Sequence, residues 1–101
     1  MPVLFSLHNV PSSRVRGEHA HRVCQQYLVA LNGSLKVVLD NGKSRETYEL
    51  NSPTFGLYMG PMIWASQYDF SLDCVLGVFA SSHYDPRDYI RNYEEFLGDL
   101  T

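Results

Sequence analysis

The sequence predicts an all-β fold, an antiparallel barrel or jelly roll that is closed by one short C-terminal helix. Three observations lead to this fold class. Short runs that favour strands recur along most of the chain, turn residues cluster between them, and an apolar pattern of helical period appears only near the C-terminus. Seven or eight short strands separated by turns are typical of antiparallel barrels and jelly rolls.

The expected strands follow one another with short connections. In chain order they cover residues 3–10, 14–23, 27–31, 35–39, 45–50, 55–59, 63–65 and 74–80. Pro11-Ser12-Ser13 ends the first strand, Asn32-Gly33 separates the third from the fourth, and Asn51-Ser52-Pro53 follows the fifth. Asn41-Gly42 lies between two strand-like runs and is the strongest hairpin signal in the chain.

The C-terminal segment changes its period. Asp85-Pro86 has the features of an N-cap followed by proline at the first helical position. The apolar residues that then recur at helical spacing are Tyr89, Ile90, Tyr93, Phe96 and Leu97. We therefore expect a helix that begins at Asp85-Pro86 and stops near Gly98.

The composition fits one compact domain over residues 1–101. Eight basic side chains and a formal net charge of -3 argue against a general nucleic-acid surface, although one or two arginines can still bind a small anion. No apolar run has the length of a membrane span, and no signal peptide is recognisable. We therefore expect a cytoplasmic protein by default. Cys24 and Cys74 lie in apolar runs and are interpreted as buried free thiols.

The segment that suggests chemistry reads RVRGEHAH, over residues 14–21. In an extended strand His19 and His21 point to the same face, and Val23 shares their parity, which suggests that this face is the interior. Two inward histidines are compatible with metal binding or with acid/base catalysis. A purely structural role in the core is the usual interpretation of a single buried histidine, and it is the competing interpretation here.

The residues favour acid/base chemistry over a metal. Metal-dependent cupins have a similar His-x-His pair followed by a glutamate and a later histidine, whereas this chain offers Gln25 or Gln26, and then Ala65 or Ser66. Two imidazoles without a third strong ligand bind a divalent metal weakly. Histidines have an unperturbed pKa of about 6.5 and can take up and return protons beside a ketone, through an enediol.

Arg16-Gly17-Glu18-His19-Ala20-His21 resembles the Arg-Gly-x-His-Ala-His signature of the dTDP-4-oxo-6-deoxyglucose 3,4-ketoisomerases, a WxcM-like family of cupins. Further blocks that are similar to this family cover residues 28–39, 56–64, 68–71 and 84–93. The resemblance extends over about residues 5–96, nearly the whole chain.

The resemblance implies a reaction and roles for individual residues. Family members move a carbonyl between C3 and C4 of a dTDP-linked 6-deoxyhexose without a metal or another cofactor. By this analogy His21 takes the C3 proton, His19 assists at the C4 oxygen or carbon, and Arg16 binds the diphosphate. Strict alternation would turn Arg16 away from the histidines, but a bulge at Gly17 would turn it back.

Three further residues are candidate substrate contacts. Gln26 could hydrogen-bond a sugar hydroxyl or a histidine, and Tyr58 and Trp64 could stack on the base or sugar, with core packing as the competing interpretation. The expected partners are the dTDP-sugar substrate and a second copy of the chain in a homodimer, with no nucleic acid and no membrane.

Two other functions stay open at this point. Ala65 stands where many family members have His or Arg after the tryptophan, and the chain begins at a strand that further strands precede in longer members. Both features are compatible with a nucleotide-sugar-binding domain that has lost the reaction. A metal-dependent cupin is the third and least favoured hypothesis.

Overall fold

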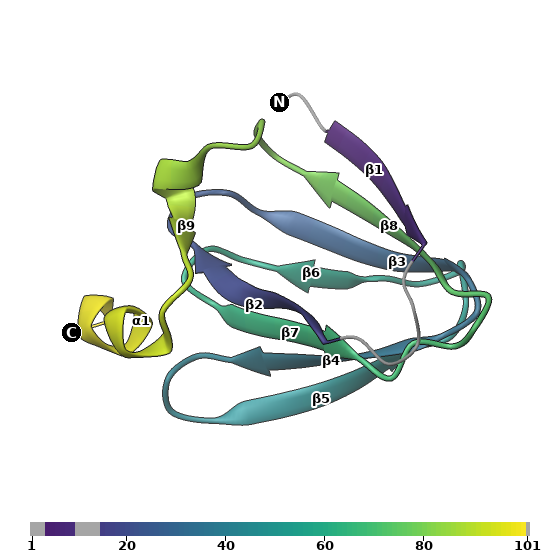
Figure 1. The fold of residues 1–101 in the computed structure, drawn as a ribbon, viewed down its shortest axis with the longest axis horizontal. Helices are drawn as coiled ribbons and strands as arrows, with labels where there is room; N and C mark the ends of the chain where they lie inside the picture. The colour runs from purple at the N-terminus through teal and green to yellow at the C-terminus, as the bar shows by residue number, and fades with distance from the viewer. Residues whose placement is uncertain (1–3, 10–14, 101) are drawn as a thin grey trace.

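The computed structural model describes residues 4–9 and 15–100 and consists of two antiparallel sheets that face one another (Figure 1). The first sheet has the order β1 (Leu4–Asn9), β8 (Val75–Ala80), β3 (Gln26–Asn32) and β6 (Leu57–Met59). The second has the order β5 (Arg45–Leu50), β4 (Leu35–Asp40), β7 (Trp64–Tyr68), β2 (Arg16–His21) and β9 (Tyr89–Ile90). The predicted all-β fold is confirmed.

The hydrophobic core lies between the sheets. Alternation along each strand sends every second side chain inward, so Leu28 and Leu76 from the first sheet meet Leu35 and Val37 from the second. All four are almost completely buried, with at most 2 % of their surface exposed. Burying such side chains contributes about 1.5–3 kcal/mol each, which makes this cluster the main source of stability.

The predicted hairpin between β4 and β5 is also present. Gly42 has a φ of 91°, a conformation that costs little only for glycine. The Asn41 side chain accepts hydrogen bonds from the backbone N–H groups of Lys43 and Ser44, which closes the turn.

A second apolar cluster covers the outer face of the five-stranded sheet. Ala20, Ile90 and Phe96 are fully buried there, and Trp64 and Tyr93 pack around them. Phe96 belongs to α1 (Tyr93–Asp99), so the C-terminal helix packs against the side of the sheet that faces away from the core.

The prediction of one helix from Asp85-Pro86 to Gly98 is wrong in its first half. Asp85 caps only a short 3₁₀ turn (Pro86–Asp88), and the chain then extends as β9, where Ile90 pairs with Ala20 of β2. The side chain of Asn92 accepts from the N–H of Glu95 and is the N-cap of the real helix. Pairing with β2 and burial of Ile90 outweigh the helical spacing, which is a tertiary effect.

The predicted stop near Gly98 is confirmed to within one residue, because α1 ends at Asp99 with its C-cap at Leu100. The second predicted strand is shorter than expected and ends at His21 rather than at Val23. Parts of the first two predicted strands and the turn between them, at residues 3 and 10–14, lie outside the described residues. None of the helices within the described ranges is long and apolar enough to cross a membrane.

Candidate active site

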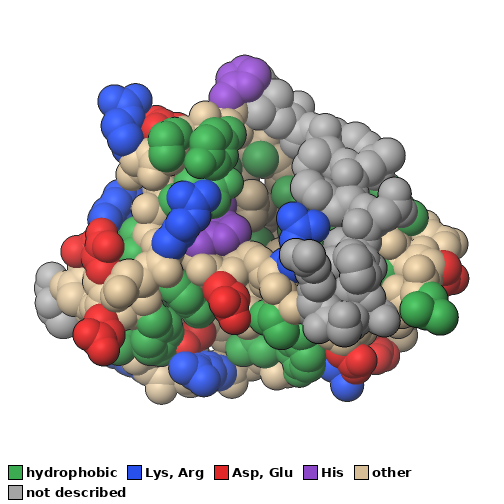
Figure 2. Space-filling model, in the orientation of Figure 1, with side chains coloured by type: hydrophobic (Ala, Val, Ile, Leu, Met, Phe, Trp, Pro, Cys, Tyr) green, Lys and Arg blue, Asp and Glu red, His purple; other side chains and the backbone are tan. Residues whose placement is uncertain are grey.

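A cavity of about 380 Å³ opens between the two sheets, beside β2 and the segment that leads to β9. His19 and His21 line it from β2, Gln26 from β3, and Asp88 and Tyr89 from the C-terminal segment. Figure 2 shows a histidine in a hollow of this face, with basic side chains on either side of it. The cavity therefore brings together side chains that are up to 73 positions apart in the chain, from Arg16 to Tyr89.

A β-bulge places Arg16 at this cavity. Arg16 pairs with Gln67 and His19 pairs with Ala65, so β2 has one residue more than β7 between these two pairs. Gly17 takes up the extra residue with a φ of 71°. The alternation of side chains is thereby reset, and both Arg16 and His19 contribute to the cavity wall.

The two histidine rings lie against one another and against one tyrosine. Their centroids are 4.9 Å apart in an edge-on arrangement, and the Tyr89 ring lies 4.8 Å from His19 and 4.4 Å from His21. Burial, as the largest cause, and electrostatic repulsion from His21 and Arg91 together lower the pKa of His19 to about 4. His19 is therefore a neutral imidazole at neutral pH, able to donate or accept one hydrogen bond at each ring nitrogen.

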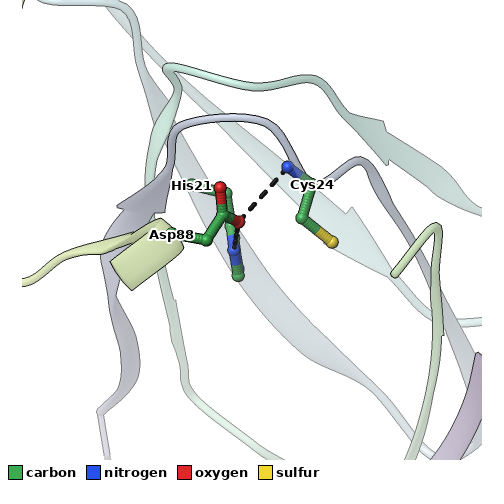
Figure 3. Close-up of side chains that lie close together, drawn as sticks. All are labelled: His21, Cys24 and Asp88. Carbon is green, nitrogen blue, oxygen red and sulfur yellow. Dashed lines mark hydrogen bonds and ion pairs between the residues drawn. The ribbon is translucent and has the colours of Figure 1, made fainter. Parts of the chain in front are cut away.

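His21 is oriented by a carboxylate (Figure 3). Its Nδ1 lies 2.9 Å from Oδ2 of Asp88, and only 7 % of His21 is exposed. Asp88 also accepts hydrogen bonds from the backbone N–H groups of Val23 and Cys24, at 2.7 and 3.2 Å. Burial raises the pKa of the Asp88 carboxyl, but these hydrogen bonds outweigh that effect and hold the pKa below its usual value.

The ionised Asp88 determines which ring nitrogen of His21 is basic. A carboxylate can only accept, so Nδ1 of His21 carries a proton, and in the neutral imidazole Nε2 is the atom with the free lone pair. This Nε2 atom is buried and has no hydrogen-bond partner within the described residues. An imidazole held in this way has the arrangement of a general base, in which the carboxylate also stabilises the imidazolium that forms.

The structure brings four of the six predicted site residues together. His19, His21, Arg16 and Gln26 line the cavity. Trp64 does not, because it packs against Tyr93 and Phe96 on the outer face of the sheet, at ring distances of 5.3 and 5.8 Å.

Tyr58 also lies away from the cavity. Its neighbour Met59 points into the core, so Tyr58 points outward, where it is 55 % exposed and donates a hydrogen bond to Gln25. For Trp64 the structure supports the competing interpretation of core packing, whereas Tyr58 lies at the surface.

Sequence reasoning missed Asp88 and Tyr89. Both lie in the segment that was assigned to a helix, where their side chains could not be placed beside β2. Val23 was used to identify the interior face, yet it is 74 % exposed because the chain turns away after His21. The histidines do face the interior, but the pairing with β7 and β9 is what puts them there.

The comparisons with known proteins agree on one family. The family model described as FdtA: WxcM-like, C-terminal matches residues 2–100. A TDP-4-oxo-6-deoxy-alpha-D-glucose-3,4-oxoisomerase from Aneurinibacillus thermoaerophilus is 45 % identical over 93 residues, which cover 92 % of this chain and 67 % of that relative.

Solved structures give the same result. WlaRA, a TDP-fucose-3,4-ketoisomerase from Campylobacter jejuni, aligns with a TM-score of 0.91 at 34 % identity and covers 100 % of this chain and 74 % of its own. QdtA, a sugar 3,4-ketoisomerase from Thermoanaerobacterium thermosaccharolyticum in complex with TDP, aligns with a TM-score of 0.89 at 40 % identity. This alignment covers 98 % of this chain and 72 % of the QdtA chain. A match over almost the whole of this chain, in sequence and in fold, shows that it belongs to the WxcM-like family of cupin-fold sugar 3,4-ketoisomerases.

Proposed function

We propose that the protein is a sugar-nucleotide 3,4-ketoisomerase that converts a dTDP-4-oxo-6-deoxyhexose into its 3-oxo isomer. The observation that carries the proposal is the pair of cavity histidines, one held by Asp88 with a free Nε2 and the other kept neutral by burial. The names of the relatives support the same reaction and the same class of substrate.

The proposed reaction moves two protons and needs no oxidant. Nε2 of His21 removes the proton from C3, the C3–H electrons form the C3=C4 double bond, and the C4 carbonyl becomes an enediolate oxygen. The C4 oxygen then takes up a proton and the C3 hydroxyl loses its own, so that C3 becomes the carbonyl carbon as a proton adds to C4. His19, whose ring centroid is 4.9 Å from that of His21, would donate to the C4 oxygen in the first half and assist proton delivery in the second.

Arg16 and Gln26 would hold the substrate. Arg16 lies at the cavity wall and forms no ion pair within the described ranges, so its guanidinium is available to pair with two diphosphate oxygens. Gln26 enters the cavity from the opposite sheet and offers one donor and one acceptor group to a sugar hydroxyl.

We infer that the reaction needs no metal. Within residues 4–9 and 15–100, His21, Cys24 and Asp88 form one group with ligand-type atoms within 4.8 Å of one another. The Asp88 oxygens already accept three N–H groups, and a cation there would have to displace His21 from its orienting hydrogen bond. Activity that survives treatment with a chelator, together with substoichiometric metal in the active sample, would agree with this inference, and loss of activity on chelation would contradict it.

The decisive experiment incubates the protein with dTDP-4-oxo-6-deoxyglucose in D2O and follows the sugar by NMR. We expect deuterium at the exchanging carbon together with a 3-oxo product, and we expect His21→Asn to lose both while it still binds TDP. Saturable TDP binding without exchange would favour a nucleotide-sugar-binding domain that lacks the reaction. The configuration of the product at C4 follows from the same spectra.

Three organisational features remain proposals. Residues 1–101 would form one cupin domain, with N-terminal strands of a longer parent as the open alternative. The homodimer can be tested by light scattering, and half-exposed Tyr27 and Tyr58 on the outer face of the four-stranded sheet offer apolar surface for it. Two free cysteines, Cys24 and Cys74, are compatible with the reducing conditions of a cytoplasmic protein.

A further inference from the structure

Arg91 lies beside His19 and has no role in the reaction as proposed above. In the antiparallel pair of β2 and β9, Ala20 faces Ile90 and His21 faces Tyr89. The same register, continued by one residue, puts His19 opposite Arg91. Side chains that face each other across such a pair have Cβ atoms about 5 Å apart.

The position of the guanidinium agrees with this register. It lies 4.3 Å from the centroid of the Tyr89 ring, and that ring is 4.8 Å from His19 and 4.4 Å from His21. The charge of Arg91 also contributes to the lowered pKa of His19, after burial and the charge of His21. The strand register and the contact with Tyr89 thus place the positive charge of Arg91 within reach of the reacting histidines.

Arg91 has no structural partner that would hold it in another role. It is exposed, and it forms no hydrogen bond or ion pair with the part of the chain that the structure describes; its contact there is the face of Tyr89. By contrast, Arg22 bridges Glu95 and Asp99, and Arg87 pairs with Asp85. The other cross-strand neighbour of His19 is Ala65, which carries no charge.

The chemistry of a pyranose separates the tasks of Arg16, which lines the cavity, and Arg91, which lies beside His19 and Tyr89. C1, which carries the diphosphate, and C4, whose oxygen becomes negative, lie on opposite sides of the ring. Arg16 precedes His19 by three residues along β2, whereas the register of β2 and β9, continued by one residue, puts Arg91 across from His19. If His19 serves the C4 oxygen, Arg91 is the cation nearest to the charge that develops there and Arg16 remains for the diphosphate.

We propose that Arg91 is a catalytic residue whose guanidinium contacts the C4 oxygen and stabilises the enediolate, an inference that rests on the proposed ketoisomerase function. The negative charge forms on this oxygen when the C3 proton leaves and disappears when the oxygen itself is protonated, before the C3 hydroxyl ionises and C4 takes up its proton. A fixed cation at that point lowers the barrier more than it strengthens substrate binding, because the ketone of the ground state carries no charge.

The test compares Arg91→Gln and Arg91→Lys with the parent and with Arg87→Gln. Arg87→Gln also removes one positive charge, from a side chain that is 89 % exposed and paired only with its neighbour Asp85. We expect Arg91→Gln to lower kcat about 30- to 100-fold, with the Kd for TDP within about twofold of the parent value. Arg91→Lys keeps the positive charge but lacks the two-pronged guanidinium group, so it should recover part of the lost kcat. Arg87→Gln should keep the parent kcat.

The outcomes separate this inference from the others. Full kcat in Arg91→Gln, or a raised Kd for TDP at unchanged kcat, would overturn it, and the second result would make Arg91 a diphosphate ligand. Equal losses in both Arg91 variants with a lower Tm would show a structural role instead. A parent protein without exchange or product would refute the ketoisomerase function itself.

One readout does not depend on turnover. Titration of the His19 ring by NMR should give a higher pKa in Arg91→Gln than in the parent, because a positive neighbour has been removed. An unchanged His19 pKa would mean that the charge does not reach this ring, which also overturns the inference.

Discussion

Replacing Asp88 by asparagine tests the arrangement of the general base most directly. Asp88→Asn preserves the shape of the side chain and removes its charge. The asparagine amide can turn its NH2 group toward Nδ1 of His21, which would move the ring proton to Nε2. His21 would then present a donor where the reaction needs an acceptor.

The size of the effect follows from the hydrogen bond that is lost. The Nδ1 to Oδ2 distance of 2.9 Å is that of a good charge-assisted hydrogen bond, which contributes about 1.5–3 kcal/mol. The imidazolium that forms when His21 takes the C3 proton loses this stabilisation in the variant. At 1.36 kcal/mol for each factor of ten, kcat should fall about 10- to 150-fold. KM should change little, because the charge of Asp88 acts on His21 and not on the bound sugar.

Asp40→Asn is the matched control. Asp40 is a buried carboxylate that also accepts three hydrogen bonds, from Tyr93, Gly42 and Arg45. It lies at the end of β4 beside the helix, away from the cavity. Both variants should lose stability in urea unfolding, and only Asp88→Asn should lose kcat in the NMR assay of product formation. The reasoning fails if Asp88→Asn turns over at the parent rate, or if Asp40→Asn is equally slow at a temperature where both are folded.

Three further predictions concern the bulge, the histidine and the outer cluster. Gly17→Ala puts a Cβ 3.0 Å from Nε2 of Gln67 at a φ of 71°, and should lower the free energy of unfolding in urea by about 1–2 kcal/mol. It should also raise KM, because the bulge positions Arg16. Gly98→Ala, where an added Cβ meets open space, should be neutral or stabilising in the same urea titration. Because the pKa of His19 is lowered to about 4, the unfolded chain binds a proton between pH 6.5 and 4 that the folded chain does not. As the pH is lowered from 6.5 to 4, the free energy of unfolding should therefore fall by about 1–2 kcal/mol, after allowance for solvent screening. His19→Gln should show a smaller decrease over the same pH range. Phe96→Ala should lower the free energy of unfolding by about 3–4 kcal/mol, and a much smaller loss would mean that α1 contributes little to the folded state.

The sequence predicted most of the sheet structure because the relevant signals are local. The run 35–39 alternates and became β4, and the Asn41-Gly42 turn lies where expected. The period of two also placed His19 and His21 on one face, which is enough to identify a site. For these features the interactions that decide the structure lie within a few residues of the signal.

The features that were missed depend on contacts between distant segments. Tyr89 and Ile90 form a strand only because β2 offers an unpaired edge about 70 positions earlier, and no local pattern in 85–97 reveals this pairing. The placement of Trp64 depends on a helix whose start was expected too early. Asp88 was missed for the same reason, because its contact with His21 forms only when the segment before β9 lies against the end of β2.

The position of β2 links catalysis to the packing on the opposite face of the sheet. Its inward side chains are the two histidines, and its outward Ala20 is buried under Ile90 and Phe96. Asp88 immediately precedes the β9 strand that Ile90 anchors, and the backbone of Asp88 accepts a hydrogen bond from Arg22 at 2.8 Å. Weaker packing of Phe96 should therefore shift Asp88 relative to His21. Substitutions in the outer cluster would then lower kcat before they unfold the protein, although none of these side chains touches the cavity.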